Sequence, residues 1–378
     1  MLKRTIYNED HEMFRASVKE FFRRELLPKI DKWEKDGIVD REFWLAAGAQ
    51  GLLLADIPEE YGGGGLDFRI NAIIFEETQM AGTDGPGFGP QNDVIAPYIY
   101  NYGTETAKRY WLPKMAKGEA IGAICMTEPN AGSDLKAIQT KATPVDGGYL
   151  LNGSKIFITN GINCDVAIVA ARIGSDKGAK TISLFLCDAA ADGFKKGRKL
   201  EKIGIRSNDT AELFFDDVFV PAENLLGEEG QGFAIMMKEL PQERISVAIR
   251  AQAAAQHAYD ITVPYVRERK AFGKSIIDFQ NTRFVLAEIK TKLQVGWAHI
   301  DACLQALLDK ELTVYQAAAA KLWHSELRFD VADACLQLFG GYGYMEEYEI
   351  ARLWRDSRCM RLYAGTSEIM KDLISRSI

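Results

Sequence analysis

A single carboxylate inside an apolar helical segment is the first candidate for chemistry in this sequence. Glu243 lies in KELPQERISVAI, directly before Arg244, and the side chains around this pair are apolar: Leu240, Ile245, Val247, Ala248 and Ile249. Most helical glutamates are exposed and have no chemical role. A glutamate buried among apolar side chains has a raised pKa and is a better base near neutral pH. The segment therefore makes Glu243 a candidate for a general base.

Five further segments combine hydroxyl, amide, aromatic and glycine residues that could contact a ligand. They are MTEPNAGSD (126–134), KIFITNG (155–161), RKAFGKSIIDFQ (269–280), LQLFGGYGY (336–344) and YAGTSEIM (363–370). Glycines let a backbone approach a ligand closely, and an arginine can bind a pyrophosphate through two parallel hydrogen bonds. Taken alone, each segment also has an ordinary interpretation: a polar turn, a hairpin, a helix ending in a glycine cap, or a helix N-cap.

Composition argues against several classes of function. The formal net charge of -7 over 378 residues argues against nucleic-acid binding, because phosphate contacts need a basic surface. The six cysteines lie far apart without a C-x-x-C pair, and the four histidines lack metal-ligand spacing. We therefore expect no metal site, no disulfide and a reducing compartment. The N-terminus has no apolar signal core and is too acidic for a transit peptide, and no apolar run approaches the ~18 residues of a membrane span. We expect a cytoplasmic protein.

The spacing of apolar residues divides the chain into zones. In residues 1–120, apolar residues recur at three- and four-residue steps, as at Phe14, Val18 and Phe22, which predicts helices. In residues 121–232, short runs such as VAIVAARI and TISLFLCD predict a domain of antiparallel strands. Within it, Asn152-Gly153 predicts a tight hairpin with a type I′ turn. The basic run KKGRKLEK (195–202) is interpreted as a solvated loop, with docking of an acidic partner or phosphorylated ligand as the alternative.

The last zone, residues 233–378, contains long helical segments joined by short loops: 233–269, 278–310 and 313–339. Such helices are typical of an antiparallel bundle. The fold class is therefore predicted as α+β, with an N-terminal all-α domain, a middle antiparallel β-domain and a C-terminal four-helix bundle. No G-x-G-x-x-G lies between a strand and a helix, so a nucleotide would not be held in the Rossmann way.

The five ligand-type segments, together with IPEEYGGGG (57–65), stand in an order that resembles the acyl-CoA dehydrogenase family over nearly the whole chain. LPQER on the first bundle helix is most similar to the long-chain subgroup. The resemblance implies FAD between the β-domain and the bundle, a fatty acyl-CoA substrate, and α,β-dehydrogenation to the trans-2-enoyl-CoA. It also implies an electron-transferring flavoprotein as electron acceptor and a homotetramer built as a dimer of dimers.

The resemblance also implies roles for individual residues. Residues that contact the cofactor are Met126, Thr127, Ser133, Phe157, Thr159, Arg269, Phe272, Gln280, Gln337, Gly340, Gly341, Thr366 and Glu368. Among these, the segment from Arg269 to Gln280 serves the flavin of the neighbouring subunit. Residues that contact the substrate are Ser133, Arg244, Tyr363, Ala364 and Gly365.

One position departs from the common pattern of the family. The late loop usually carries the catalytic glutamate between an aromatic residue and a glycine, where this chain has Ala364. Long-chain and isovaleryl enzymes carry the base on the first bundle helix instead, at the position of Glu243. The resemblance therefore implies that Glu243 is the base and that the Ala364 N–H binds the thioester oxygen.

Two other functions remain open at this point. One is a flavin oxidase or monooxygenase on the same fold, which would reoxidise rapidly in air. The other is a catalytically silent binding or assembly protein, whose flavin no acyl-CoA would bleach. The sequence leaves the length and branching of the acyl group open.

Overall fold

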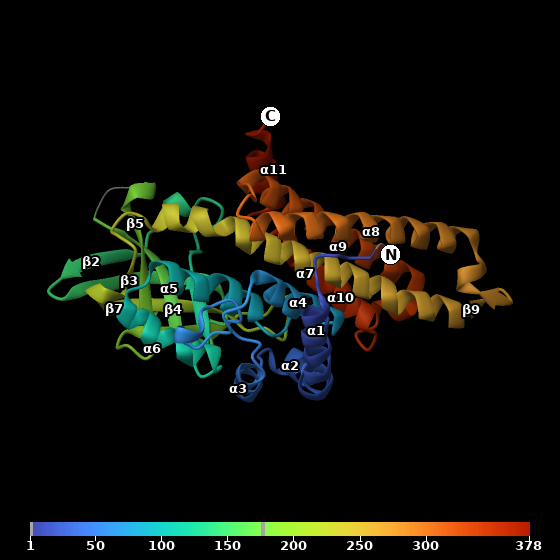
Figure 1. Ribbon diagram of the computed structural model, residues 1–378, viewed down its shortest axis with the longest axis horizontal. Coiled ribbons are helices and arrows are strands. Elements are labelled where there is room, and N and C mark those ends of the chain that lie inside the picture. Colours follow the sequence, from blue (N-terminus) through green and yellow to red (C-terminus); the bar gives the residue numbers. More distant parts are fainter. Residues whose placement is uncertain (1–2, 175–177) are drawn as a thin grey trace.

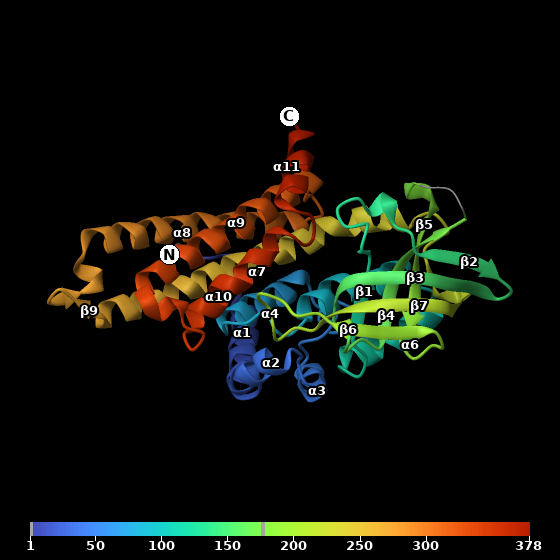
Figure 2. The ribbon, with the colours of Figure 1, turned by 180° about the vertical axis from the view of Figure 1, so that it is seen from behind.

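The computed structural model describes residues 3–174 and 178–378. In Figure 1 the β-sheet lies at one end of the molecule, the long C-terminal helices lie toward the other end, and the first N-terminal helices, in blue, lie beneath the middle. Figure 2 shows the same arrangement from behind. The N-terminal helices are α1 (Glu9–Phe21), α2 (Ile30–Asp36), α3 (Arg41–Ala49), α4 (Phe68–Met80), α5 (Ala96–Tyr102) and α6 (Glu105–Ala116). A π-helix, Gly89–Ile95, leads directly into α5.

Side-chain caps begin α1, α4 and α6. The Asn8 side chain accepts a hydrogen bond from the His11 amide at 3.1 Å and begins α1. In the same way Asp67 accepts from the Arg69 amide at 2.9 Å and begins α4. Such caps bond backbone N–H groups that have no partner within the helix. Asp40 stands at the N-cap of α3, but its side chain binds Lys32 instead of the helix.

The middle zone forms one eight-stranded sheet of order β6-β7-β3-β2-β4-β5-β8, with β1 beside β4. The strands are β1 (Gly122–Cys125), β2 (Lys141–Val145), β3 (Gly148–Thr159), β4 (Val166–Ile173), β5 (Ile182–Asp188), β6 (Phe194–Lys199), β7 (Thr210–Pro221) and β8 (Leu225–Leu226). Most neighbours are antiparallel, as predicted, but β4 pairs in parallel with β1 and with β2. The sequence gives no signal for these two parallel pairings.

Two local predictions in this zone are wrong. Asn152-Gly153 lies inside β3, not in a turn, and the hairpin between β2 and β3 turns at Asp146-Gly147. Gly153 serves a close approach instead, because a Cβ there would come within 2.8 Å of the Thr140 Cα. The basic run at Lys195 is also not a loop, since it forms the edge strand β6 beside β7. Lysines on an edge strand discourage pairing with another sheet.

The C-terminal zone contains the predicted bundle. Its helices are α7 (Gly232–Glu268), α8 (Gln280–Leu308), α9 (Val314–Phe339), α10 (Glu349–Ser357) and α11 (Ser367–Ser375). One apolar core joins α7, α8, α9 and α10 through Ala258, Leu293, Val331 and Leu353. A short hairpin of β9 (Lys270–Ala271) and β10 (Lys274–Ser275) links α7 to α8 at the end of the molecule opposite the sheet (Figure 1).

The described residues also bear on the predicted absences. All six cysteines are free. Over residues 3–174 and 178–378 no cluster of three His, Cys, Asp or Glu side chains could hold a metal ion. In the same part of the chain, no helix has both the length and the apolar character that crossing a membrane requires.

Candidate active site

Glu243 lies in the first half of α7, where its carboxyl group is half-buried against α5. The Tyr98 hydroxyl donates a hydrogen bond to Glu243 Oε1 at 3.1 Å. Burial, followed by the nearby Asp93 carboxylate, raises the pKa of Glu243 to about 8, whereas the Tyr98 bond lowers it. A carboxyl group with such a pKa can bind and release a proton near neutral pH. The sequence around Glu243 marks that residue as a candidate, but it does not point to Tyr98 or Asp93 as its neighbours.

The Asp93 carboxyl group is buried between the π-helix and α7. Gln242 Nε2 donates to Asp93 Oδ1 at 2.8 Å, and the Ser246 hydroxyl donates to Asp93 Oδ2. These donors flank Glu243 in the sequence. Burial raises the pKa of Asp93 to about 7, and the two hydrogen bonds oppose that rise. One buried and one half-buried carboxyl group therefore lie beside the same turn of α7.

The late loop brings Ala364 to this part of α7. Tyr363 and Ala364 pack on a small cluster that contains Val247, one turn after Glu243, and Ala251. Ala364 and Gly365 have positive φ angles of 52° and 92°. No described residue accepts a hydrogen bond from the Ala364 N–H. The loop thus presents an unpaired backbone donor close to the helix that carries Glu243.

A buried lysine holds this loop and was not predicted from the sequence. Lys321 on α9 is fully buried, and its Nζ donates to the Gly365 carbonyl oxygen at 2.6 Å. Burial lowers the pKa of Lys321 to about 8. The only hint in the sequence is an isolated lysine in the apolar run AAAAKLW (317–323). A lone cation on an apolar helical face is a signal for such an internal contact.

Two further polar groups near the loop are buried without a partner. Arg244 Nε and the Tyr363 hydroxyl make no hydrogen bond to the described residues. Burial lowers the pKa of Arg244 and raises that of Tyr363. Buried polar atoms without partners are costly unless a ligand completes their hydrogen bonds. Both residues are among those predicted to contact the substrate.

Thr366 and Glu368 open α11 beside this loop. The Thr366 hydroxyl accepts a hydrogen bond from the Ile369 amide at 3.3 Å, so it is an N-cap. Glu368 is exposed. Ser367 donates to Glu326 of α9 at 2.6 Å and ties the start of α11 to the bundle. The predicted cap is confirmed, and the two predicted cofactor contacts remain predictions.

The sheet contributes a second set of predicted residues. The Ile156 amide donates to the Thr127 carbonyl oxygen at 3.0 Å, which places MTEPNAGSD and KIFITNG side by side. Lys155 Nζ reinforces this by donating to the Met126 carbonyl oxygen at 3.1 Å. Phe157 has a positive φ of 61° and 64% of its surface exposed.

Two other predicted residues belong to these two segments. Thr159 ends β3, and Ser133 is exposed in the loop that follows β1. The sheet therefore presents an exposed aromatic ring beside backbone and hydroxyl groups.

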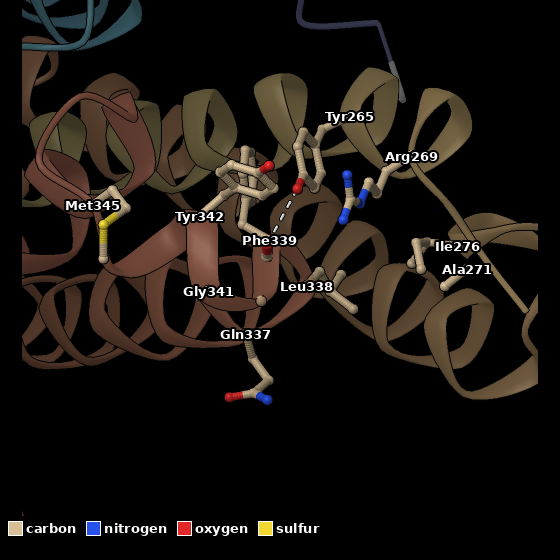
Figure 3. Close-up of a pocket in the computed structure, with 11 residues that line it drawn as sticks. Tyr265, Arg269, Ala271, Ile276, Gln337, Leu338, Phe339, Gly341, Tyr342 and Met345 are labelled. Carbon is tan, nitrogen blue, oxygen red and sulfur yellow. Dashed lines mark hydrogen bonds between the residues drawn. The ribbon is translucent and has the colours of Figure 1, made fainter.

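The remaining predicted residues lie at the far end of the bundle. Arg269, Gln337, Gly340 and Gly341 line a hollow of about 660 Å³. Figure 3 shows the Arg269 guanidinium beside Tyr265 and Tyr342, with Gln337 pointing away from it. Because Glu243 and Arg269 are separated by 26 positions along α7, they lie roughly 40 Å apart at 1.5 Å per residue. One chain therefore does not bring the two groups together.

Phe272 and Gln280 lie at the same end, on the hairpin and at the first position of α8. Phe272 is 95% exposed, although its ring lies 6.2 Å from that of Phe279. At Gly340, where φ is 60°, an added Cβ would meet nothing within 4 Å. A flat ring system can pack on exposed aromatic rings and can approach a glycine that has free space around it. An exposed guanidinium can bind a pyrophosphate through two parallel hydrogen bonds.

Comparison with known proteins identifies the fold family. Residues 8–119, 123–218 and 230–378 match the N-terminal, middle and C-terminal domains of acyl-CoA dehydrogenases. The chain belongs to the acyl-CoA dehydrogenase family. It is 48% identical over 377 residues to the mitochondrial long-chain specific acyl-CoA dehydrogenase of Sus scrofa, covering 99% of this chain and 88% of the relative. It is 35% identical to the mitochondrial isovaleryl-CoA dehydrogenase of Oryza sativa subsp. japonica, with coverage of 99% and 92%.

Solved structures agree with this assignment. The crystal structure of an acyl-CoA dehydrogenase from Geobacillus kaustophilus is 45% identical, with a TM-score of 0.97 and 99% of each chain covered. A Bacillus anthracis acyl-CoA dehydrogenase complexed with FAD has a TM-score of 0.92 at 30% identity, covering 98% of this chain and 68% of that one. A chain from the structural work on the electron transferring flavoprotein of Acidaminococcus fermentans has a TM-score of 0.94 at 36% identity, with 98% of each chain covered.

These comparisons confirm several predictions from the sequence. This acyl-CoA dehydrogenase has the predicted three-part α+β fold and is an oxidoreductase that acts on acyl-CoA with FAD as cofactor. The exposed aromatic rings and open glycines described above fit that cofactor. The role of each individual site residue remains a prediction.

Proposed function

We propose that this acyl-CoA dehydrogenase oxidises a fatty acyl-CoA thioester to the trans-2-enoyl-CoA with Glu243 as the base. The observation that carries the proposal is a half-buried Glu243 one turn before Val247 of α7, on which the late loop packs with Ala364 in place of the usual glutamate. Burial raises the pKa of Glu243 to about 8. A base with that pKa can take up the weakly acidic α-proton of a thioester.

In this mechanism the protein side chains bind, orient and deprotonate the substrate. The Ala364 N–H donates to the thioester oxygen and stabilises the charge that develops there. Lys321 fixes the loop through the Gly365 carbonyl. Glu243 takes the α-proton on Oε2, since Tyr98 already occupies Oε1. FAD, when bound, accepts the hydride that leaves the β-carbon.

Arg244 and Tyr363 lie near the late loop. Their unpaired polar atoms, Arg244 Nε and the Tyr363 hydroxyl, suit contacts with the substrate. Gly365 and Ser133 complete the residues that we propose for substrate binding. Ser133 is also exposed enough to contact the flavin.

The cofactor site is proposed to form between subunits. Met126, Thr127, Phe157 and Thr159 bind the flavin of their own chain, with Thr366 and Glu368 at the start of α11. The far-end residues bind the cofactor of the adjacent chain: Arg269, Phe272, Gln280, Gln337, Gly340 and Gly341. The roughly 40 Å between the two groups supports this division. A site shared between subunits requires at least a dimer, and we propose the homotetramer, a dimer of dimers, that the family resemblance implies.

The electron acceptor and the cell compartment are finer predictions. We infer that an electron-transferring flavoprotein accepts the electrons, and the similarity to the Acidaminococcus fermentans chain supports this acceptor. The cytoplasmic location remains a prediction, and the porcine and rice relatives are mitochondrial by name.

We also propose domain boundaries that give domains of residues 1–120, 121–232 and 233–378. All the relatives named above whose activity is stated are dehydrogenases, which favours a dehydrogenase over an oxidase, a monooxygenase or a silent homologue.

The direct test replaces the base while keeping its shape. Glu243→Gln retains a hydrogen-bonding side chain that cannot take a proton, so FAD and palmitoyl-CoA should still bind. Anaerobic bleaching of the flavin by palmitoyl-CoA should slow by at least the ~10²–10⁴-fold typical of general-base removal. A matched control, Glu239→Gln one turn earlier, should reduce its flavin at close to the wild-type rate, and Glu368→Gln tests the acidic residue of the late loop as a rival base. Wild-type bleaching in Glu243→Gln together with loss in Glu368→Gln would move the base to the late loop.

A further inference from the structure

Two buried residues of the N-terminal zone face Glu243, and neither belongs to the sequence segments assigned above. Asp93 is on the π-helix Gly89–Ile95, and Tyr98 is on α5, which follows it directly. Exposure is 3% for Asp93 and 0% for Tyr98. The Glu243 carboxyl group on α7 therefore accepts a hydrogen bond from Tyr98, and its neighbour Gln242 bonds Asp93, both from a part of the chain about 150 residues earlier.

Tyr98 distinguishes the two oxygens of the Glu243 carboxyl group. Its hydroxyl donates to Oε1 at 3.1 Å, and no described residue donates to Oε2. A donated hydrogen bond favours the ionised carboxylate and fixes its rotation. Tyr98 thus keeps one oxygen held and leaves the other free for a proton.

Asp93 acts on Glu243 by charge and not by contact. Its carboxylate accepts from Gln242 and Ser246, the residues one position before and three positions after Glu243. Both donors are neutral, so they stabilise a negative Asp93 without cancelling its charge. When Asp93 is ionised, its charge disfavours a second negative charge on Glu243 and strengthens the hold of Glu243 on a proton.

We propose that Tyr98 and Asp93 are positioning residues with opposite effects on the base, Tyr98 by holding the ionised carboxylate and Asp93 by repelling it. The inference rests on the proposed role of Glu243. Repulsion by Asp93 makes Glu243 a stronger base for the α-proton. The Tyr98 bond keeps enough of Glu243 ionised for that proton to be taken up. The two carboxyl groups titrate as a coupled pair.

Other charged groups also face this pair from the elements packed against it. They are Glu239 and Arg244 on α7, Asp56 and Arg250 near Asp93, and Lys321 on α9 near Arg244. After burial, Asp93 and Tyr98 have the largest effects on Glu243, ahead of Glu239 and Arg244. A second tyrosine–glutamate contact lies one turn away, where the Tyr102 hydroxyl donates to Glu239 Oε1 at 2.5 Å. It provides a matched control on the same two helices.

The experiment measures the rate of flavin bleaching by palmitoyl-CoA in anaerobic stopped flow across the pH range. Asp93→Asn removes the repulsion, so the acid limb of the profile should move to lower pH. Tyr98→Phe removes the bond to the carboxylate, so the limb should move to higher pH. Each shift should be about one pH unit, the size that one interaction with a charged group supplies. Tyr102→Phe should move the acid limb by no more than about a third of a pH unit.

A further variant guards against misfolding, and FAD content and Tm are recorded for every protein. Ser246→Ala removes one donor to Asp93, favours its neutral form, and should move the limb in the same direction as Asp93→Asn by a smaller amount. The proposal is overturned if Asp93→Asn and Tyr98→Phe leave the acid limb of the pH–rate profile unmoved, or if both variants move it in the same direction. In that case Glu243→Gln still lacks flavin bleaching, so the base assignment stands. Wild-type bleaching in Glu243→Gln instead overturns the base assignment itself.

Discussion

The two groups of predicted site residues differ in what surrounds them. Around Glu243 the side chains are buried or half-buried, and partners from α5, the π-helix and α9 complete much of their bonding. Around Arg269 the residues are exposed, with Phe272 at 95% and open space over Gly340. The residues of the proposed proton-transfer site are thus held by contacts within one chain. At the far end it offers a surface that only a ligand or another chain can complete.

The largest effect is expected from moving the base across this internal site. Glu243→Gly should slow flavin bleaching by about 10²–10⁴-fold. Adding Ala364→Glu to that variant should restore part of the rate, because the loop and the helix pack on the same cluster at Val247. Anaerobic stopped flow with palmitoyl-CoA measures both. An unrecovered double variant that binds FAD normally would mean that position 364 does not face the α-carbon.

The division between the two ends can be tested by mixing two inactive chains. Arg269→Ala damages the far end and Glu243→Gln the internal site. If each site combines its own base with the other subunit's arginine, hybrid dimers carry one intact site. Random pairing should then recover about a quarter of the wild-type rate. Absence of recovery, with hybrids verified by native mass spectrometry, would place both residues in one subunit's site.

A smaller effect is expected at Lys321, which supports the internal site without touching the reacting atoms. Lys321→Met keeps the length of the side chain but releases the Gly365 carbonyl. We expect kcat to fall about tenfold with palmitoyl-CoA, since a hydrogen bond from a charged group contributes about 1.5–3 kcal/mol. KM should change less. Lys321→Arg should recover part of kcat, and a uniform loss of folded protein in both variants would indicate a structural role alone.

The smallest effect concerns stability and should separate the two ends. The pKa of Glu243 is raised to about 8 in the folded chain. The folded state therefore holds this proton more tightly than the unfolded state, and the associated stability is lost as pH rises through about 8. Glu243→Gln should be more stable than wild type by about 1–3 kcal/mol above pH ~8 and similar to it below pH ~5. Thermal unfolding across the pH range measures this, and Arg269→Ala should show no such trend.

Much of the architecture follows from local patterns in the sequence. The segment 233–269 predicts α7 to within one residue of Gly232–Glu268, and 313–339 predicts α9 equally well. The ends of long helices can be predicted from the sequence, because the spacing of apolar residues persists over many turns. The turn predicted at Asn152-Gly153 is wrong because the same dipeptide suits either a turn or a close approach of backbone, here to Thr140. Only the neighbouring strand decides between them.

By itself, the sequence determined the helical and β zones and the candidate base at Glu243, since these depend on residues adjacent in the chain. The tertiary structure decided what acts on that base. Tyr98 lies 145 positions from Glu243, and Lys321 lies 44 from Gly365, so no local pattern relates them. The raised pKa of Glu243 has the same origin, because burial and charge depend on what the fold packs against α7. The length of α7 likewise separates the far-end residues from the base, so a single chain cannot place both groups in one site.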